Sequence, residues 1–175
     1  DNAGKVVSKG FELSSTYAPE DFLPFRGDIS FFANYTFTNA NLDGAANSTD
    51  EESAFAGGRD GSNVPYIPDH RLSFGADYEY NDFDFGVNMT YHSESHGTAD
   101  ESETEEFNGS ADARNGKIDD AFLLNFYAGY DFMENYRISA GVNNATDLEY
   151  IASRHPSGAR RGAPLTAYVK AVANF

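Results

Sequence analysis

The stretch GAPLTAYVKAVANF, residues 162–175, decides the fold. Read at a period of two, it has one apolar face and one mixed face. The apolar face holds Leu165, Ala167, Val169, Ala171, Ala173 and Phe175, and the mixed face holds Thr166, Tyr168, Lys170, Val172 and Asn174. This alternation is typical of a half-buried β-strand. Its aromatic end at Phe175 suits a strand whose apolar face meets lipid and whose last ring lies in an aromatic girdle.

Stretches upstream alternate in the same way. They predict strands over residues 6–17, 28–38, 71–80, 83–92, 122–132 and 136–143. Short and long connections alternate between these strands, and the long loops cover residues of about 39–69, 93–117 and 147–161. Long loops on one side and brief turns on the other are typical of outer-membrane barrels. A soluble up-and-down barrel, the alternative, has no reason to separate its loops in this way.

The sequence therefore predicts an all-β fold for residues 1–175, an antiparallel transmembrane β-barrel segment of about seven strands. That count is odd, whereas single-chain bacterial barrels have an even number of strands, from about 8 upward. We therefore expect the chain to be the C-terminal part of a larger barrel.

The composition excludes several classes of protein. The chain has 175 residues and no cysteine, which excludes a disulfide scaffold and a thiolate metal site. Its net charge of -16 makes nucleic acid a poor partner. A mean hydropathy of -0.55 would suit a soluble domain, but in a barrel strand only alternate residues touch lipid while the loops are polar.

No catalytic or metal-binding arrangement is visible, so we expect neither an enzyme nor a cofactor. The histidines are scattered over loops and strand ends, at His70, His92, His96 and His155. A spacing of four residues, as between His92 and His96, joins metal ligands on a helix and not on a strand. No serine lies in a G-x-S-x-G turn. The acidic loops are expected to be solvated, with divalent-cation binding as the alternative.

Three motifs carry a family resemblance. The run NNATDLEY at residues 143–150, a short Arg- and Gly-rich loop, and then GAP at 162–164 before a strand closing on Phe175 resemble the C-terminal signature of TonB-dependent receptors. VPYIPDHRL at 64–72 and NGKI at 115–118 are similar to strand starts of the same family, most of all its iron-chelate members. The resemblance covers essentially the whole chain. Leu165 departs from it, since the family more often has Arg there.

This resemblance implies a barrel of about 22 strands around a plug domain that this chain does not contain. It implies an outer-membrane protein in contact with lipid and lipopolysaccharide, with Phe175 as part of the signal read by the barrel assembly machinery. The function it implies is active uptake of a ferric chelate, a siderophore or an iron-citrate-like ligand, coupled to the TonB complex through the plug. The alternatives are a passive porin-like channel and a soluble β-barrel binding module.

The third long loop is unusual because it concentrates positive charge. Arg154, His155, Arg160 and Arg161 lie within it, in a chain of only 12 Lys and Arg residues. Arginine pairs with carboxylates through two parallel hydrogen bonds, so these four residues are predicted to bind the anionic ligand. The alternative is that they pair with the acidic loops or with lipopolysaccharide.

Overall fold

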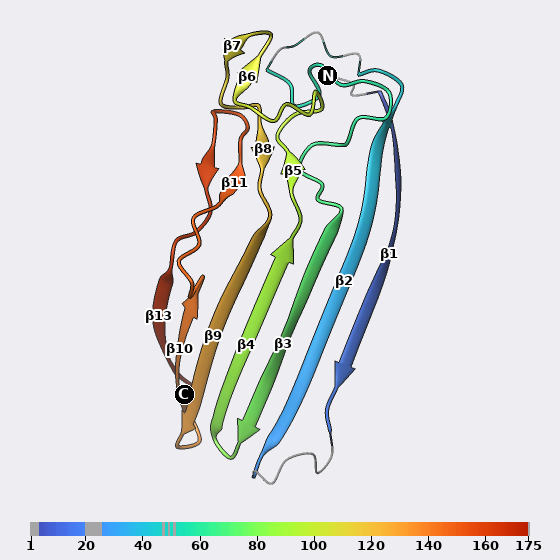
Figure 1. The fold of residues 1–175 in the computed structure, drawn as a ribbon. Coiled ribbons are helices and arrows are strands. Elements are labelled where there is room, and N and C mark those ends of the chain that lie inside the picture. Colours follow the sequence, from blue (N-terminus) through green and yellow to red (C-terminus); the bar gives the residue numbers. More distant parts are fainter. Residues whose placement is uncertain (1–3, 20–25, 47, 49, 51, 175) are drawn as a thin grey trace.

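The computed structural model describes residues 4–19, 26–46, 48, 50 and 52–174. Within this part of the chain, no helix is long and apolar enough to cross a membrane. One antiparallel sheet has the strand order β1-β2-β3-β4-β9-β10-β13 (Figure 1). Its strands are β1 Lys5–Tyr17, β2 Asp28–Asp43, β3 His70–Tyr80, β4 Phe83–His92, β9 Ala121–Phe132, β10 Tyr136–Asn143 and β13 Thr166–Ala173. The predicted seven-stranded antiparallel segment is therefore confirmed.

The long connections gather at one end of this sheet, and the tight β3–β4 and β9–β10 turns lie at the other (Figure 1). We call residues 44–69 the first loop, 93–120 the second loop and 144–165 the third loop. They contain short antiparallel pairs, in which β5 joins β8, β6 joins β7 and β11 joins β12. The bounds are β5 Ser95–His96, β6 Glu106–Phe107, β7 Ser110–Ala111, β8 Lys117–Ile118, β11 Ile151–Ser153 and β12 Arg160–Arg161.

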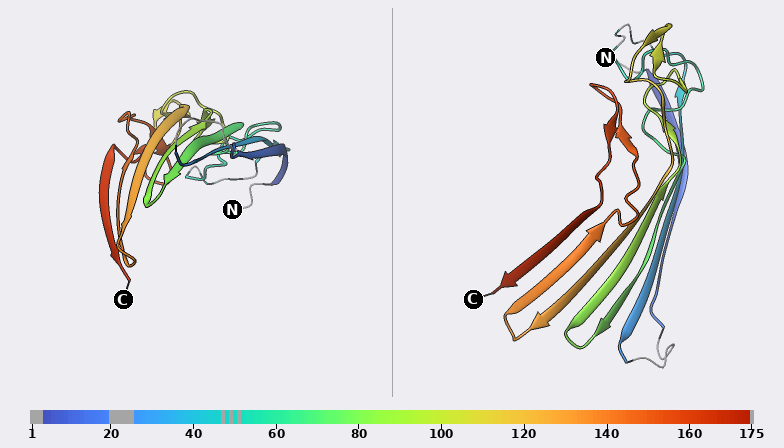
Figure 2. Two further views of the ribbon diagram at one scale, coloured as in Figure 1. Left: turned by 90° about the horizontal axis from the view of Figure 1, so that it is seen from below. Right: turned by 60° about the vertical axis from the view of Figure 1, so that its left-hand side comes forward.

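The sheet curves, but it does not close. Its edges, β1 and β13, lie apart in both views of Figure 2, and no backbone pairing joins them. The segment is thus part of a barrel wall, with one convex and one concave side.

One face of the wall is apolar across every strand. Residues paired across neighbouring strands share a face, and one such row runs Leu13, Tyr35, Leu72, Tyr91 and Phe122 from β1 to β9. The protein itself does not bury these side chains fully: Leu13 on the edge strand keeps 64% of its surface exposed and Phe122 keeps 41%, and the other three are half-buried. A contiguous exposed apolar surface of this extent needs a non-aqueous environment or another protein to cover it.

The opposite face is polar, and charged side chains pair on it. Arg137 of β10 forms ion pairs with Asp84 of β4 and Asp131 of β9. The Tyr127 hydroxyl donates a hydrogen bond to the Asp77 carboxylate. These charged groups far from the loops thus have partners two or fewer strands away, which lowers the cost of placing them on a partly enclosed wall.

Aromatic rings lie flat over glycines on this polar face. Tyr127 is paired with Gly86, and a methyl group built on Gly86 would meet its ring at 2.2 Å. The Tyr168 ring covers Gly141 of the neighbouring strand in the same way, at 2.5 Å. Only glycine permits so close an approach. Gly86 and Gly141 therefore provide the space that these cross-strand rings occupy.

Strand β2 is longer than the sequence pattern predicted. The first loop was expected to begin near residue 39, but β2 runs on to Asp43. The loop then folds back, so that the Leu42 amide donates to the Ser62 carbonyl and the Val64 amide to the Ala40 carbonyl, both at 2.9 Å. Leu42 and Ala40 are buried, as is Ala99 of the second loop. The loops therefore form a packed layer with a small core of their own.

Candidate functional site

A cavity of about 500 Å³ lies where the wall meets the loops. The wall side includes the row Thr36, Arg71 and His92, which are direct partners on β2, β3 and β4. Tyr66 of the first loop, Ile118 of the second and Tyr150 of the third line it from the loop side. The rest of the lining is Asn34, Pro68, Leu72, Ser73, Thr90, Tyr91, Ser95, Ile151 and Ala152.

The electrostatics of this cavity differ from those of the whole chain. Its lining contains no Asp or Glu, although the chain has 28 of them and a net charge of -16. Arg71 supplies its positive charge, and within the described residues the Arg71 guanidinium has no hydrogen-bond or ion-pair partner. The cavity near Asp77 and Asp84, at the other end of the wall, is instead lined by several carboxylates. An unpaired guanidinium among hydroxyl and amide groups is suited to an anion.

Tyr66 joins the first loop to both of the others. Its backbone amide donates to the His96 carbonyl of the second loop at 3.0 Å. Its hydroxyl accepts hydrogen bonds from the Arg154 amide at 3.1 Å and the His155 amide at 2.9 Å, both in the third loop. The same oxygen lies 2.9 Å from His155 Nδ1, to which it can donate its proton.

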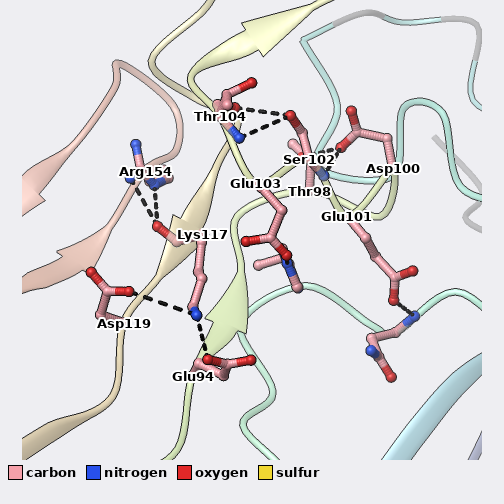
Figure 3. A network of polar contacts seen from close by, with 12 residues as sticks. Glu94, Thr98, Asp100, Glu101, Ser102, Glu103, Thr104, Lys117, Asp119 and Arg154 are labelled. Carbon is pink, nitrogen blue, oxygen red and sulfur yellow. Dashed lines mark hydrogen bonds and ion pairs between the residues drawn. The ribbon is translucent and has the colours of Figure 1, made fainter.

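Arg154 joins the third loop to the second. It is 5% exposed. Its Nε and Nη2 donate to the Lys117 carbonyl at 3.1 and 2.8 Å, as Figure 3 shows, and Nη1 donates to Glu105 Oε1 at 2.8 Å and to the Ala113 carbonyl at 3.3 Å. We call Tyr66, Arg154 and His155, with these partners, the three-loop clasp.

Glycines in the second loop make room for the Arg154 side chain. A methyl group built on Gly97 would lie 3.0 Å from Arg154 Cδ, and one on Gly116 would lie 3.2 Å from Cζ. Gly116 also has a φ of +106°, a conformation that favours glycine. The NGKI motif thus places a glycine where the guanidinium passes and, one residue later, the carbonyl that accepts from it.

The surroundings of His155 favour its neutral form. Burial lowers the pKa of His155 from its ordinary value of 6.5, and the nearby Arg114 guanidinium lowers it further, while Asp112 opposes both effects. A neutral imidazole can accept a hydrogen bond at one nitrogen. The Tyr66 hydroxyl can therefore donate to Nδ1, with the ring proton on Nε2.

The structure separates the four residues that were predicted from sequence to bind a ligand. Arg154 and His155 lie in the clasp, where all the hydrogen bonds of the Arg154 guanidinium go to the second loop. The contact of Arg154 with Glu105 corresponds to the alternative stated above, in which the arginines of the third loop pair with the acidic loops. Arg160 and Arg161 form the exposed β12, and Arg161 contacts Glu149 at 3.3 Å. Phe175 lies outside the described residues.

Sequence reasoning missed two residues of the site. The alternation over residues 71–80 places Arg71 on the polar face of its strand, but nothing in the sequence shows that its guanidinium stays unpaired. Tyr66 lies between prolines in VPYIPDHRL, and its φ of +65° is uncommon for a non-glycine residue. In the part of the chain that the structure describes, no three His, Asp or Glu side chains come together to hold a metal ion.

Comparisons with known proteins agree with this architecture. A family model described as "TonB dependent receptor-like, beta-barrel" matches residues 1–145. Among solved structures, the unliganded ferric citrate transporter FecA superposes with a TM-score of 0.79 at 25% identity, over 98% of this chain and 25% of FecA.

Two siderophore-type receptors share the fold at lower identity. The siderophore receptor PiuA of Acinetobacter baumannii gives a TM-score of 0.70 at 19% identity, over 97% of this chain and 22% of PiuA. The ferripyoverdine receptor of the Pseudomonas aeruginosa outer membrane gives 0.66 at 19% identity, over 97% of this chain and 20% of the receptor. The chain spans a quarter or less of each of these structures. On the family match and the sheet topology, the chain belongs to the TonB-dependent receptors and forms part of their β-barrel.

Proposed function

We propose that this chain forms part of the wall and loops of an outer-membrane receptor that takes up an anionic ferric chelate, with energy delivered through the TonB complex. In this arrangement the apolar face meets lipid, the long loops lie outside the cell beside lipopolysaccharide, and the short turns face the periplasm. Coupling to TonB runs through a plug that this chain does not contain. Phe175 belongs to the signal read by the barrel assembly machinery.

The observation that carries this proposal is the acid-free cavity with its unpaired Arg71. A ferric chelate with free carboxylates presents planar anionic groups, which an arginine fork binds through two parallel hydrogen bonds. Thr36, Ser73 and Thr90 add hydroxyl groups to the same lining. The FecA neighbour, which is a ferric citrate transporter, supports a ligand of this kind.

The basic loop has two roles in this proposal. Arg160 and Arg161 are exposed on β12, where they attract the anion as it arrives past the acidic loops. Arg154 and His155 act from within the clasp, by holding the loop side of the cavity in place. Pairing of Arg160 and Arg161 with lipopolysaccharide phosphates is the alternative use of the same charges.

The test uses the full-length receptor in detergent and in cells. Arg71→Gln should weaken ferric citrate binding by about ten- to a hundredfold, the loss of one charge-assisted contact of about 1.5–3 kcal/mol. The matched control is Arg59→Gln, which removes the same charge from an exposed first-loop position and should change the affinity by less than twofold. Equal affinities in wild type and Arg71→Gln would refute the assignment of the cavity.

Measurement of iron uptake by cells distinguishes active from passive transport. Cells with the receptor should accumulate iron from ferric citrate only when TonB is present. Uptake that continues without TonB would favour the passive porin-like channel. Recovery of the full-length protein from cells without detergent would favour the soluble binding module.

A further inference from the structure

Tyr66 is placed where two features of the molecule meet. Its side chain lines the cavity, and its hydroxyl belongs to the three-loop clasp. Ile151 and Ala152 line the same cavity and lie three and two residues before Arg154, whose backbone amide the hydroxyl contacts. A displacement of the third loop at the clasp therefore moves part of the cavity lining.

The bonding capacity of the Tyr66 hydroxyl is fully used. A tyrosine hydroxyl offers one proton and accepts at its oxygen. Here the proton goes to His155 Nδ1, while the oxygen accepts from the Arg154 and His155 amides. The two rings also meet edge to face, with centroids 6.1 Å apart and planes at 87°. The contact thus fixes both the backbone and the imidazole of the third loop.

We infer that Tyr66 is a positioning residue whose hydroxyl holds the third loop in place at the cavity, so that the three loops form a preassembled roof. This inference rests on the proposed function only in taking the cavity as the place where the chelate binds. The roof is built without ligand, because every contact of the clasp joins one part of this chain to another. Ligand recognition then depends on a hydroxyl that need not touch the ligand.

The clasp predicts how removal of this one oxygen acts. Tyr66→Phe keeps the ring, and with it the shape of the cavity, but leaves the Arg154 and His155 amides without their acceptor. Buried amide groups without partners favour opening of the loop towards water. Arg154 still anchors the loop through its guanidinium, so the loop loosens without the barrel losing its fold.

Tyr168→Phe is the matched control. Tyr168 lies on the polar face of β13, outside the lining of the cavity, and its ring covers Gly141. Within the described residues its hydroxyl has no hydrogen-bond partner. The two variants therefore remove the same atom from a tyrosine ring, and only one of them cuts the clasp.

Hydrogen–deuterium exchange on the full-length receptor without ligand tests the clasp directly. In Tyr66→Phe, amides of residues 151–161 should exchange at least about tenfold faster, a change in the opening equilibrium worth about 1.4 kcal/mol, while amides of β3 and β4 stay protected. Tyr168→Phe should leave both regions unchanged. Unaltered exchange in Tyr66→Phe, or equal acceleration in both variants, would overturn the inference.

Ferric citrate titration of the same proteins tests the positioning role. Tyr66→Phe should bind at least about tenfold more weakly and Tyr168→Phe within about twofold of wild type. A loosened loop with unchanged affinity would overturn the positioning role of Tyr66. If wild-type receptor binds no ferric chelate while Tyr66→Phe still frees the loop, the proposed function fails and the clasp stands.

Discussion

Replacement of Arg154 by methionine gives the sharpest test of how the loops are held. Methionine keeps a long, unbranched side chain that fits beside Gly97 and Gly116, but it has no donor. The Lys117 carbonyl loses both of its guanidinium hydrogen bonds, and the Ala113 carbonyl loses one. Glu105 loses its ion pair as well.

The expected cost follows from the exposure of each partner. Loss of both donors at the carbonyl of the half-buried Lys117 costs about 1–3 kcal/mol, whereas water can replace the donor at the exposed Ala113. Glu105 has 55% of its side chain exposed, so water replaces its lost partner and the ion pair contributes at most about 1 kcal/mol. Docking of the third loop should therefore weaken by about 2–4 kcal/mol, or about 30- to 1,000-fold in its opening equilibrium.

The assay is amide exchange in the full-length receptor, with the His155 amide as reporter. That amide donates to the Tyr66 hydroxyl of the first loop at 2.9 Å and becomes free when the third loop opens. Glu105→Gln should accelerate its exchange by no more than about fivefold, in line with a half-exposed partner. Arg160→Met makes the same chemical change at an exposed position and should have no effect.

Two outcomes would refute this reasoning. If Glu105→Gln opened the loop as much as Arg154→Met, the ion pair and not the carbonyl contacts would hold the clasp. If neither variant changed the exchange of the His155 amide, the third loop would be held by contacts outside the clasp. Arg154→Lys, which keeps the charge but not the planar fork, should fall between wild type and Arg154→Met.

Three further predictions concern the wall, the pH and the exposed arginines. Val87→Arg, on the apolar face, should destabilise the receptor in lipid vesicles by about 2–4 kcal/mol in unfolding titrations, whereas Asn88→Arg on the polar face should be tolerated; equal costs would contradict the assignment of the faces. Because the pKa of His155 is lowered on docking, the docked loop binds fewer protons than the free loop, so docking is complete above about pH 6.5 and weakens as the pH falls toward the lowered pKa; protection factors of the third loop across this range check the sign, and a rise on acidification would contradict it. The double variant Arg160→Gln with Arg161→Gln should slow ferric citrate association and flatten its dependence on salt, and stopped-flow rates that match wild type would return both residues to a role at lipopolysaccharide.

The strands could be predicted from sequence because each one carries its own signal. The alternation in residues 83–92 can be recognised without reference to the neighbouring strand. Pairing of the strands then only has to place their apolar residues on the same face of the sheet. The end of β2 was missed because Asn39 to Asp43 reads NANLD, a run of residues that disfavour strands. Its two inward residues, Ala40 and Leu42, do alternate, but they are strand residues only because the first loop packs on them.

The clasp could not be predicted in the same way. Arg154 and the carbonyl of Lys117 are 37 positions apart, and Tyr66 and His155 are 89 apart. Nothing local ties these residues together, since their contacts exist only once three loops have been placed by the sheet beneath them. Composition gave the positive charge of the third loop correctly, but it could not tell a buried arginine such as Arg154 from an exposed one such as Arg160.

The open edges of the sheet have a consequence for how this wall can exist at all. Along the outer sides of β1 and β13, alternate residues point their N–H and C=O groups away from the sheet with no strand to receive them. Hydrocarbon supplies no replacement, and each such group left bare in a bilayer costs several kcal/mol. In water the same edges would template pairing with other copies. In a bilayer, this stretch of wall is therefore stable only when further strands cover both edges.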